Sequence, residues 1–205
     1  MYKNRLKKNA YIVRPLGIDA ARTLVESHHY ARGASNTAVA IHGLFPAGSF
    51  EPLGVCWWLP PTKSAALATY PESWRAVLAL SRLVVVPGVP KNAASFLLSR
   101  SMKMIDRHTW PCLVTYADEW QGHVGTIYRA TNWTYVGMTK PQPTYVMDGR
   151  MISRKAGPVT RTHKEMIDMG CEFLGKHAKH KFIHVIENAQ PQQPKMTQGA
   201  LFDIA

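Results

Sequence analysis

The sequence Ser81-Arg82-Leu83-Val84-Val85-Val86-Pro87 opens the stretch that decides the fold. Its β-branched residues, closed by Pro-Gly, predict a strand, and a loop over residues 88–92 is followed by helical periodicity over 93–105. A second strand-like run over 111–118 ends on a carboxylate and leads through a glycine-containing loop into another helix over 126–133. The stretch therefore predicts two strand–helix units in succession, which is the outline of a scaffold for acyl-coenzyme A.

The segment from Leu83 to Leu98 resembles the strand, loop and helix of the GNAT acetyltransferase family, which wrap a cofactor pyrophosphate in backbone N–H groups. Residues 127–137 resemble the family's next motif, a tyrosine on a helix, then a small–aromatic pair and a strand. The resemblance implies an α/β (α+β) fold, a GNAT-like mixed central sheet with helices on both faces. One departure is that Pro90-Lys91-Asn92-Ala93-Ala94-Ser95 replaces the glycine-rich loop.

The GNAT resemblance also implies which residues hold the cofactor. Tyr128 matches a tyrosine near the cofactor sulfur, where its hydroxyl can protonate a leaving thiolate. On residue type alone, an aromatic on the inner face of a helix is equally compatible with core packing. The residues expected to bind acetyl-CoA or a related acyl-CoA are Val85, Lys91, Asn92, Ala93, Ala94, Ser95 and Asn132.

Four separate short sequence motifs occur in the same order as in the Mom family. They are His29-Tyr30, Leu80-Ser81-Arg82-Leu83, Tyr116-Ala117-Asp118 and Gly122-His123-Val124-Gly125-Thr126-Ile127-Tyr128, and the resemblance covers roughly residues 10–185. Mom proteins are phage-encoded enzymes that convert DNA adenine to an N6-carbamoylmethyl derivative and so protect DNA from restriction. The resemblance implies that activity here, with His29, Tyr30, Arg82, Asp118 and Tyr128 as catalytic residues.

Asp118 ends the second central strand, where open α/β sheets place ligand and catalytic groups. It is either a cap for the following turn or a carboxylate that accepts a hydrogen bond or proton from the adenine amine, and the family resemblance favours the second role. Arg82 stands inside an apolar run, and a buried guanidinium requires a carboxylate or phosphate partner. We therefore expect Arg82 in the site, with Asp118 as a candidate partner.

The His29-Tyr30 pair suggests a secondary hypothesis, a metal site. Together with Asp118 these residues would offer oxygen and nitrogen ligands suited to iron. In the alternative interpretation, His28 and His29 are neighbours at a helix end, where one side chain is exposed and the other is packed.

Trp120 lies in a loop beside Asp118 and is the tryptophan best placed to stack on a flipped base. Trp57 and Trp58 lie in an apolar strand, a position typical of core residues.

The composition indicates an anionic partner. The 205 residues include 25 Lys and Arg against 13 Asp and Glu, a formal net charge of +12. This balance meets the electrostatic criterion for double-stranded DNA, although an anionic cofactor also prefers a basic surface. The residues expected to contact phosphates are Arg154, Lys155, Arg161, Lys164, Lys176, Lys179 and Lys181.

Cysteine and hydropathy patterns point to the cytoplasm, and the resemblance to a phage family implies the cytoplasm of a host cell. The three cysteines are far apart and odd in number, so we expect reduced and mostly buried thiols. We expect no association with a membrane, because no run approaches the ~20 apolar residues of a span and the basic N-terminus lacks an apolar signal core. A zinc site at His177, His180 and His184 is disfavoured, because their spacing crosses from a basic run into a strand.

The rest of the chain is expected to complete one GNAT-like domain over residues 1–186, with a basic portion from about 150 to 186. Before residue 81 we expect a strand, a helix capped by Asp19, two hairpin strands and a helix over 72–78. After Gly137 we expect a hairpin over 144–152, an amphipathic helix over 162–174 and a strand over 182–186.

Residues 187–205 form a Gln/Pro-rich tail that we expect to be flexible. Its pentapeptide Gln198-Gly199-Ala200-Leu201-Phe202 resembles the Gln-x-x-Leu-Phe motif by which bacterial DNA enzymes dock on the sliding clamp. The alternative is that Leu201 and Phe202 pack on the protein's own core.

Two other functions are compatible with the sequence. One is a GNAT N-acetyltransferase that acts on a protein or small amine, which would turn over acetyl-CoA without DNA. The other is a catalytically inactive DNA-binding module, which the altered pyrophosphate loop would permit.

Overall fold

The computed structural model describes residues 5–33, 35–156 and 159–185. Its elements are η1 (Lys8–Ala10), β1 (Tyr11–Pro15), α1 (Ile18–His28), β2 (Ala40–Pro46), β3 (Gly54–Leu59), α2 (Lys63–Leu67), η2 (Pro71–Ala76), β4 (Val77–Val85), α3 (Ala93–Met104), β5 (Cys112–Asp118), η3 (Glu119–Gln121), α4 (Thr126–Arg129), β6 (Thr134–Met138), β7 (Gln142–Met147), β8 (Arg150–Ile152), β9 (Lys155–Ala156), β10 (Val159–Thr160), α5 (His163–Asp168), β11 (Glu172–His177) and β12 (Lys179–Val185). No helix in these ranges is long and apolar enough to cross a membrane.

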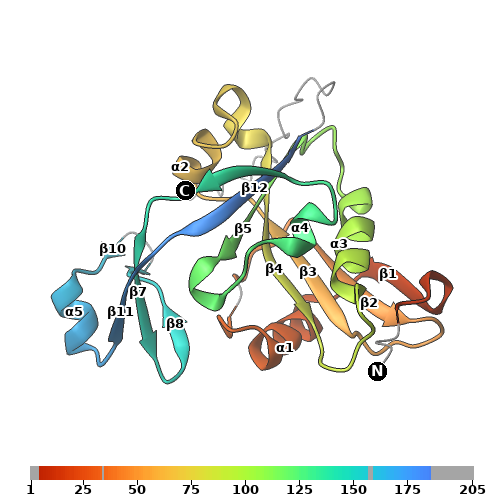
Figure 1. The fold of residues 1–205 in the computed structure, drawn as a ribbon, viewed down its shortest axis with the longest axis horizontal. Helices are drawn as coiled ribbons and strands as arrows, with labels where there is room; N and C mark the ends of the chain where they lie inside the picture. Colours follow the sequence, from red (N-terminus) through yellow and green to blue (C-terminus); the bar gives the residue numbers. More distant parts are fainter. Residues whose placement is uncertain (1–4, 34, 157–158, 186–205) are drawn as a thin grey trace, which may run out of the picture.

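A seven-stranded mixed sheet forms the centre of the molecule, with the order β1-β2-β3-β4-β5-β12-β6 (Figure 1). Strands β4 and β5 are parallel, whereas the other neighbours are antiparallel. The fold class predicted from the sequence is therefore confirmed, with helices on both faces of the sheet.

Side-chain alternation along β3 explains why both faces are covered. Val55 and Trp57 pack in a cluster with α1 residues, whereas Cys56 and Trp58 belong to the cluster that contains α3 residues. Successive side chains of a strand point to opposite faces, so one apolar strand supplies two cores. Trp57 and Trp58 are fully buried, as expected for core residues.

The central strands β4 and β5 separate at one end. They pair only over Val77–Ala79 and Cys112–Val114. Beyond that point β4 continues beside β3, and β5 continues beside β12. The separation leaves an opening in the middle of the sheet, at the end where β5 reaches Asp118.

A second, smaller sheet is inserted between β6 and β12. We call the described residues from 142 to 177 the inserted lobe; they hold β7, β8 and β11 in a three-stranded sheet together with α5 (Figure 1). Tyr145, Met166 and Cys171 form a separate buried cluster within it. Only Ala178 separates β11 from β12, so the chain passes directly from the lobe into the central sheet.

The expected helix over 162–174 was wrong in its second half. Helix α5 ends at Asp168, and Gly170 follows with a φ of 88°, a left-handed conformation that ends the helix. Phe173 then lies on strand β11 and packs against Tyr145 at a ring-centroid distance of 5.3 Å.

Other expected boundaries also differ. Helix α4 ends at Arg129 rather than at residue 133, and β4 spans Val77–Val85 rather than 81–87. The segment over 72–78 is not a helix throughout: η2 ends at Ala76, and the apolar run that follows already belongs to β4. Helix α1 starts after Gly17 rather than at an Asp19 cap and ends at His28. His29 and Tyr30 therefore lie just beyond the helix.

Candidate active site

The opening between β4 and β5 holds a cavity of about 360 Å³, which we call the β4–β5 cavity. Its apolar wall includes Leu83 and Val85 of β4, and Ala94 lies at the start of α3. Tyr128 of α4 lines the opposite side, and His29 and Tyr30 lie at one end. The cavity thus connects the expected pyrophosphate loop with the catalytic residues suggested by the sequence.

The segment Pro90–Ser95, which contains no glycine, holds one residue in a left-handed conformation. Asn92 caps α3 with a φ of 67°, and asparagine is among the few side chains that tolerate this left-handed conformation. The Ser95 hydroxyl donates to the Asn92 carbonyl at 3.0 Å. Asn92 therefore occupies a conformation for which glycine is the usual residue.

The residues expected to bind the cofactor are not all in one place. Val85 and Ala94 line the β4–β5 cavity, and Asn92 and Ser95 line a neighbouring groove of about 250 Å³. That groove also carries the cations Lys8, Arg100 and Lys103. Ala93 is buried, Lys91 is exposed beside the loop, and Asn132 lines neither space.

Tyr128 is held by aromatic packing. Its ring lies 5.2 Å from that of Phe182 and 5.9 Å from that of Trp133, measured between centroids. Burial raises the pKa of its hydroxyl, so the group stays protonated at neutral pH. Packing and function are thus compatible, because the same side chain lines the β4–β5 cavity.

Gly125 allows α4 to approach the sheet closely. It precedes α4 with a φ of 75°, and a Cβ atom there would overlap the ring of Phe182. The glycine in the word Gly122–Tyr128 is therefore required for both its conformation and its lack of a side chain.

A second cavity, of about 720 Å³, lies between the central sheet and the inserted lobe; we call it the interlobe cavity. It is lined from the core by Tyr30, Ala31, Gly33, Arg82, Asp118, Trp120 and Lys179, and from the lobe by Gln142, Pro143, Thr144, Tyr145, Met151, Ile152, Ser153, Arg154, Lys155, Thr160 and His177. Tyr30 lines both cavities, which therefore meet at its side chain.

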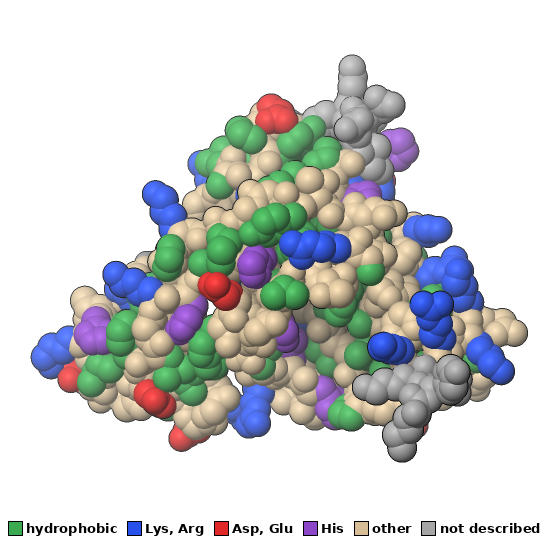
Figure 2. All heavy atoms as spheres, in the orientation of Figure 1, with side chains coloured by type: hydrophobic (Ala, Val, Ile, Leu, Met, Phe, Trp, Pro, Cys, Tyr) green, Lys and Arg blue, Asp and Glu red, His purple; other side chains and the backbone are tan. Residues whose placement is uncertain are grey.

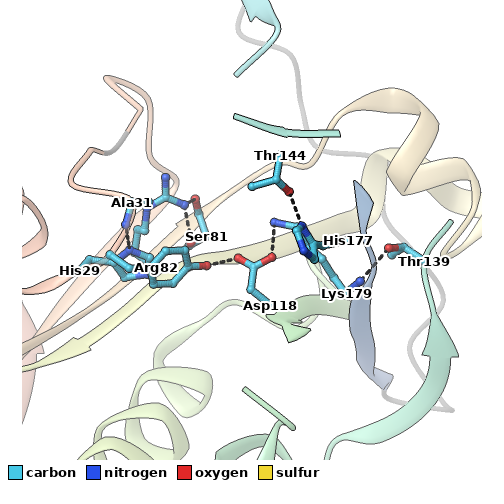
Figure 3. A network of polar contacts seen from close by, with 10 residues as sticks. His29, Ala31, Ser81, Arg82, Asp118, Thr139, Thr144, His177 and Lys179 are labelled. Atoms are coloured by element: carbon cyan, nitrogen blue, oxygen red, sulfur yellow. Dashed lines mark hydrogen bonds and ion pairs between the residues drawn. The ribbon is translucent and has the colours of Figure 1, made fainter. Parts of the chain in front are cut away.

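Asp118 is the centre of a polar network at this junction (Figure 3). Its carboxylate accepts a hydrogen bond from the Tyr30 hydroxyl and pairs with the Lys179 ammonium at 2.7 Å. The Asp118 side chain is only 9% exposed, which makes this counter-ion important. Strand register brings the pair together, since Asp118 of β5 lies directly opposite Lys179 of β12.

His29 is neutral at physiological pH. Burial, and next the charge of Arg82, lowers the pKa of His29 from 6.5 to about 4. Its Nδ1 accepts the Ala31 backbone N–H at 3.0 Å, so the ring proton is on Nε2. The ring stacks on Tyr30 with 4.3 Å between centroids, and burial and the bond to Asp118 raise the pKa of the Tyr30 hydroxyl.

Arg82 lines the interlobe cavity but does not pair with Asp118 as expected. Its Nε donates to the Gly33 carbonyl at 2.8 Å, and one terminal nitrogen donates to the Ser81 carbonyl at 2.7 Å. The same terminal nitrogen also donates to the Ser81 hydroxyl at 3.2 Å. Lys179 takes the position of cationic partner. A half-buried guanidinium whose hydrogen bonds go to uncharged oxygens keeps its charge available to an anionic ligand.

The iron hypothesis is not supported by the geometry. The described residues contain no group of three His, Cys, Asp or Glu side chains arranged to hold a metal ion. The proposed ligands are engaged with one another or with the backbone, because Tyr30 donates to Asp118 and His29 Nδ1 accepts from Ala31.

The residues expected to contact DNA are dispersed. Arg154 and Lys155 line the interlobe cavity, whereas Lys164 pairs with Asp168 at 2.6 Å. Lys179 pairs with Asp118, and the Lys181 ammonium donates to the Ala68 carbonyl at 2.9 Å. Lys176 is exposed on β11, and the Arg161 carbonyl accepts from Arg154 Nε at 2.7 Å.

Lys and Arg side chains are seen on both sides of the molecule, over the inserted lobe and towards α3 and the N-terminus (Figure 2). On this face the Lys and Arg side chains therefore do not form one continuous patch.

The three histidines considered for zinc have different partners. His177 bonds Thr144 at 3.0 Å, His180 bonds Tyr135 at 3.2 Å, and His184 lies 3.4 Å from an Arg107 nitrogen.

Several site residues were missed in the sequence. Lys179 was assigned to DNA contacts, because its pairing with Asp118 depends on the register of distant strands. His123 belongs to the motif Gly122–Tyr128 and lies edge-on to Tyr30, with 5.8 Å between ring centroids. That motif could therefore have identified His123 as a site residue. Gln142 and His177 enter the site only through the fold of the inserted lobe.

The Mom protein family model matches residues 10–199 of the chain. Methylcarbamoylase Mom of Escherichia phage Mu is 27% identical over 135 residues, which are 63% of this chain and 54% of the phage Mu protein. The chain thus spans about half the length of this curated relative.

Solved structures of acetyltransferases share the fold. YncA of Salmonella typhimurium, solved with its cofactor acetyl-CoA, has a TM-score of 0.53 at 12% identity, covering 89% of this chain and 98% of that chain. A GNAT-family acetyltransferase of Desulfovibrio desulfuricans has a TM-score of 0.50 at 10% identity, covering 86% and 99%. The central sheet and its helices therefore have a GNAT-like fold.

Proposed function

Because the chain belongs to the Mom protein family, we propose that it modifies the N6 amine of adenine in double-stranded DNA, attaching a carbamoylmethyl group that protects the DNA from restriction. The observation that carries this proposal is the junction at Tyr30. One apolar cavity and one cationic cavity share this side chain, and Asp118 is bonded to it. A donor and an acceptor bound in separate cavities would meet beside a carboxylate.

The β4–β5 cavity suits an acyl-CoA cofactor. Leu83, Val85 and Ala94 would hold the pantetheine arm, and the start of α3 would receive the pyrophosphate on its free backbone N–H groups. The groove beside it carries Lys8, Arg100 and Lys103, which suit further phosphate groups. When bound, the cofactor would supply an activated thioester.

A carbamoylmethyl group contains an amide nitrogen that acetyl-CoA does not supply. In addition, N6 is bonded to the CH2 carbon, so forming this bond from an acetyl group breaks a C–H bond and removes two electrons. The modification therefore requires a nitrogen-containing co-substrate and a two-electron oxidant as well as the thioester, and its test must determine the mass of the product rather than follow loss of the thioester.

The chain's own residues supply the acid and base chemistry. The Asp118 carboxylate is the group placed to take the proton that the adenine amine loses as its new N–C bond forms. Lys179 and the Tyr30 hydroxyl hold that carboxylate in position. The neutral His29 can donate from Nε2, and the protonated Tyr128 hydroxyl can donate to a leaving group in the β4–β5 cavity.

The interlobe cavity suits a flipped nucleotide. A base inside a duplex is out of reach of an enclosed carboxylate, so the nucleotide must rotate out of the stack. Arg82, Arg154 and Lys155 line the cavity and would attract the sugar–phosphate backbone that accompanies the base.

The proposal is tested by digesting DNA from cells that express the protein and measuring the masses of the nucleosides by mass spectrometry. We expect N6-carbamoylmethyl deoxyadenosine with the wild type and its loss with Asp118→Asn. A matched control is Asp148→Asn, since Asp148 is exposed in the turn between β7 and β8 and Asn accepts its φ of 52°. Unmodified deoxyadenosine from well-expressed wild type would refute DNA modification, and an N6-acetyl product would reduce the activity to simple acetyl transfer.

A further inference from the structure

We propose that the inserted lobe selects the acceptor base: Gln142 reads the amine-bearing edge of adenine, while Trp120 and His177 together form a platform against one face of the base. The inference rests on the proposed function and adds the residues that distinguish adenine from other purines. All three side chains line the interlobe cavity.

Trp120 and His177 lie beside each other, although they come from two different parts of the molecule. Trp120 follows β5 in η3, whereas His177 ends β11 in the lobe, and their ring centroids are 6.1 Å apart at an interplanar angle of 43°. Nucleic-acid bases stack on such aromatic rings whichever base they are, because every base has a π-face. The pair would therefore contribute affinity, but little discrimination.

The position of this pair relative to Asp118 follows from strand register. Trp120 is two residues after Asp118, and His177 is two residues before Lys179. Because Asp118 and Lys179 lie opposite each other on β5 and β12, the aromatic pair sits next to the ion pair. A base held by the two rings would thus have the carboxylate close by.

His177 is held in place by the lobe. Its Nδ1 bonds the Thr144 hydroxyl at 3.0 Å, and Thr144 is 7% exposed (Figure 3). A ring fixed in this way loses little rotational freedom when a base packs against it.

Gln142 supplies the group that can discriminate. It begins β7, lies directly opposite His177 in the β7–β11 register and is exposed at the cavity. A carboxamide presents one acceptor and one donor side by side, which matches the N6 hydrogen and the N7 acceptor of adenine, whereas hypoxanthine and guanine present two acceptors, O6 and N7, at that edge. Hypoxanthine and guanine carry a carbonyl in place of that amine and would oppose the amide oxygen.

The test measures binding of two single-stranded oligonucleotides by fluorescence anisotropy at fixed salt. Each contains one purine in a pyrimidine background, either adenine or hypoxanthine. The full-length wild type should bind the adenine oligonucleotide about 10-fold tighter or more, the effect of one bidentate contact. Gln142→Leu should bring the ratio close to one. Gln121→Leu, a change in the neighbouring η3 at a residue that lines neither cavity, should leave it unchanged.

The stacking residues should act differently from Gln142. Trp120→Ala should weaken both oligonucleotides by a similar factor, about 5-fold to 100-fold, with the adenine preference kept. Trp120→Phe, which retains a ring, should restore most of the affinity, and thermal melting should show that each variant is folded.

An adenine preference that survives Gln142→Leu would overturn the assignment, as would unchanged affinity in folded Trp120→Ala. Failure of the proposed function is a separate result, because it appears as unmodified DNA from cells that express the wild type.

Discussion

Replacing Lys179 by methionine should show that the ion pair with Asp118 stabilises the folded site. The two charges are 2.7 Å apart, and at an effective dielectric constant near 20 their attraction is roughly 6 kcal/mol before other costs. Desolvation and side-chain ordering oppose most of this, and the Lys179 side chain is 41% exposed. We therefore expect a net coupling of about 1–2 kcal/mol.

A double-mutant cycle measures that coupling directly. Urea unfolding would be followed for the wild type, Lys179→Met, Asp118→Asn and the double variant. Asparagine is suitable because its side-chain oxygen still accepts the Tyr30 hydroxyl proton. Lys181→Met is the matched control, since Lys181 lies on the same face of β12 but bonds the Ala68 carbonyl.

The reasoning is refuted if the Lys179–Asp118 coupling is below about 0.5 kcal/mol, the error of additive behaviour for independent sites. It is also refuted if Lys181→Met couples to Asp118→Asn as strongly as Lys179→Met does. Raised salt should reduce the coupling only modestly, because the Asp118 side chain is mostly buried.

Three further predictions concern pH, DNA binding and the C-terminal tail. Burial lowers the pKa of His29 to about 4, so the unfolded chain binds more protons and the free energy of unfolding should decrease as pH falls from about 6.5 to 4. In urea titrations, the decrease in the free energy of unfolding should be about 1 kcal/mol smaller in His29→Gln than in the wild type, given the partial exposure of the ring. An identical decrease in both proteins would contradict the assignment. Replacing Arg154 and Lys155 by Ala should flatten the slope of log affinity for duplex DNA against log salt by about two contacts of 0.9 each, whereas an unchanged slope would place the DNA elsewhere. The clamp motif lies outside the described residues; replacing Leu201 and Phe202 by Ala should abolish co-purification with the sliding clamp without lowering the melting temperature, and destabilisation would instead indicate that the tail is packed.

Local pattern was sufficient to predict the centre of the fold. The apolar run after Arg82 and the helical periodicity after Asn92 depend on near neighbours in the sequence, and both predicted the right type of element. Helix α3 matches its expected bounds closely, whereas β4 spans Val77–Val85 rather than 81–87. Asp118 was recognisable because a carboxylate at the end of an apolar strand is unusual. In the segment Pro90–Ser95, which contains no glycine, Asn92 adopts the left-handed conformation that glycine usually takes.

The polar contacts of the site were not predictable, because they depend on non-local pairing. Lys179 reaches Asp118 only through the antiparallel register of β12 and β5, and Arg82 finds its acceptors on Gly33 and Ser81. The structure of the inserted lobe could not be predicted for the same reason. Gly170 ends its helix early, and the strand that follows is stabilised by packing across to β7.

The central claim is that two ligands bind in separate cavities that meet at Tyr30, and hydrogen–deuterium exchange measures this most directly. Coenzyme A should protect residues 83–95 and 122–130, and an adenine oligonucleotide should protect 142–155. Each ligand alone should also protect the segment 29–33, which borders both cavities. The account would be contradicted if both ligands protected the same residues beyond 29–33, or if the oligonucleotide left 142–155 unchanged.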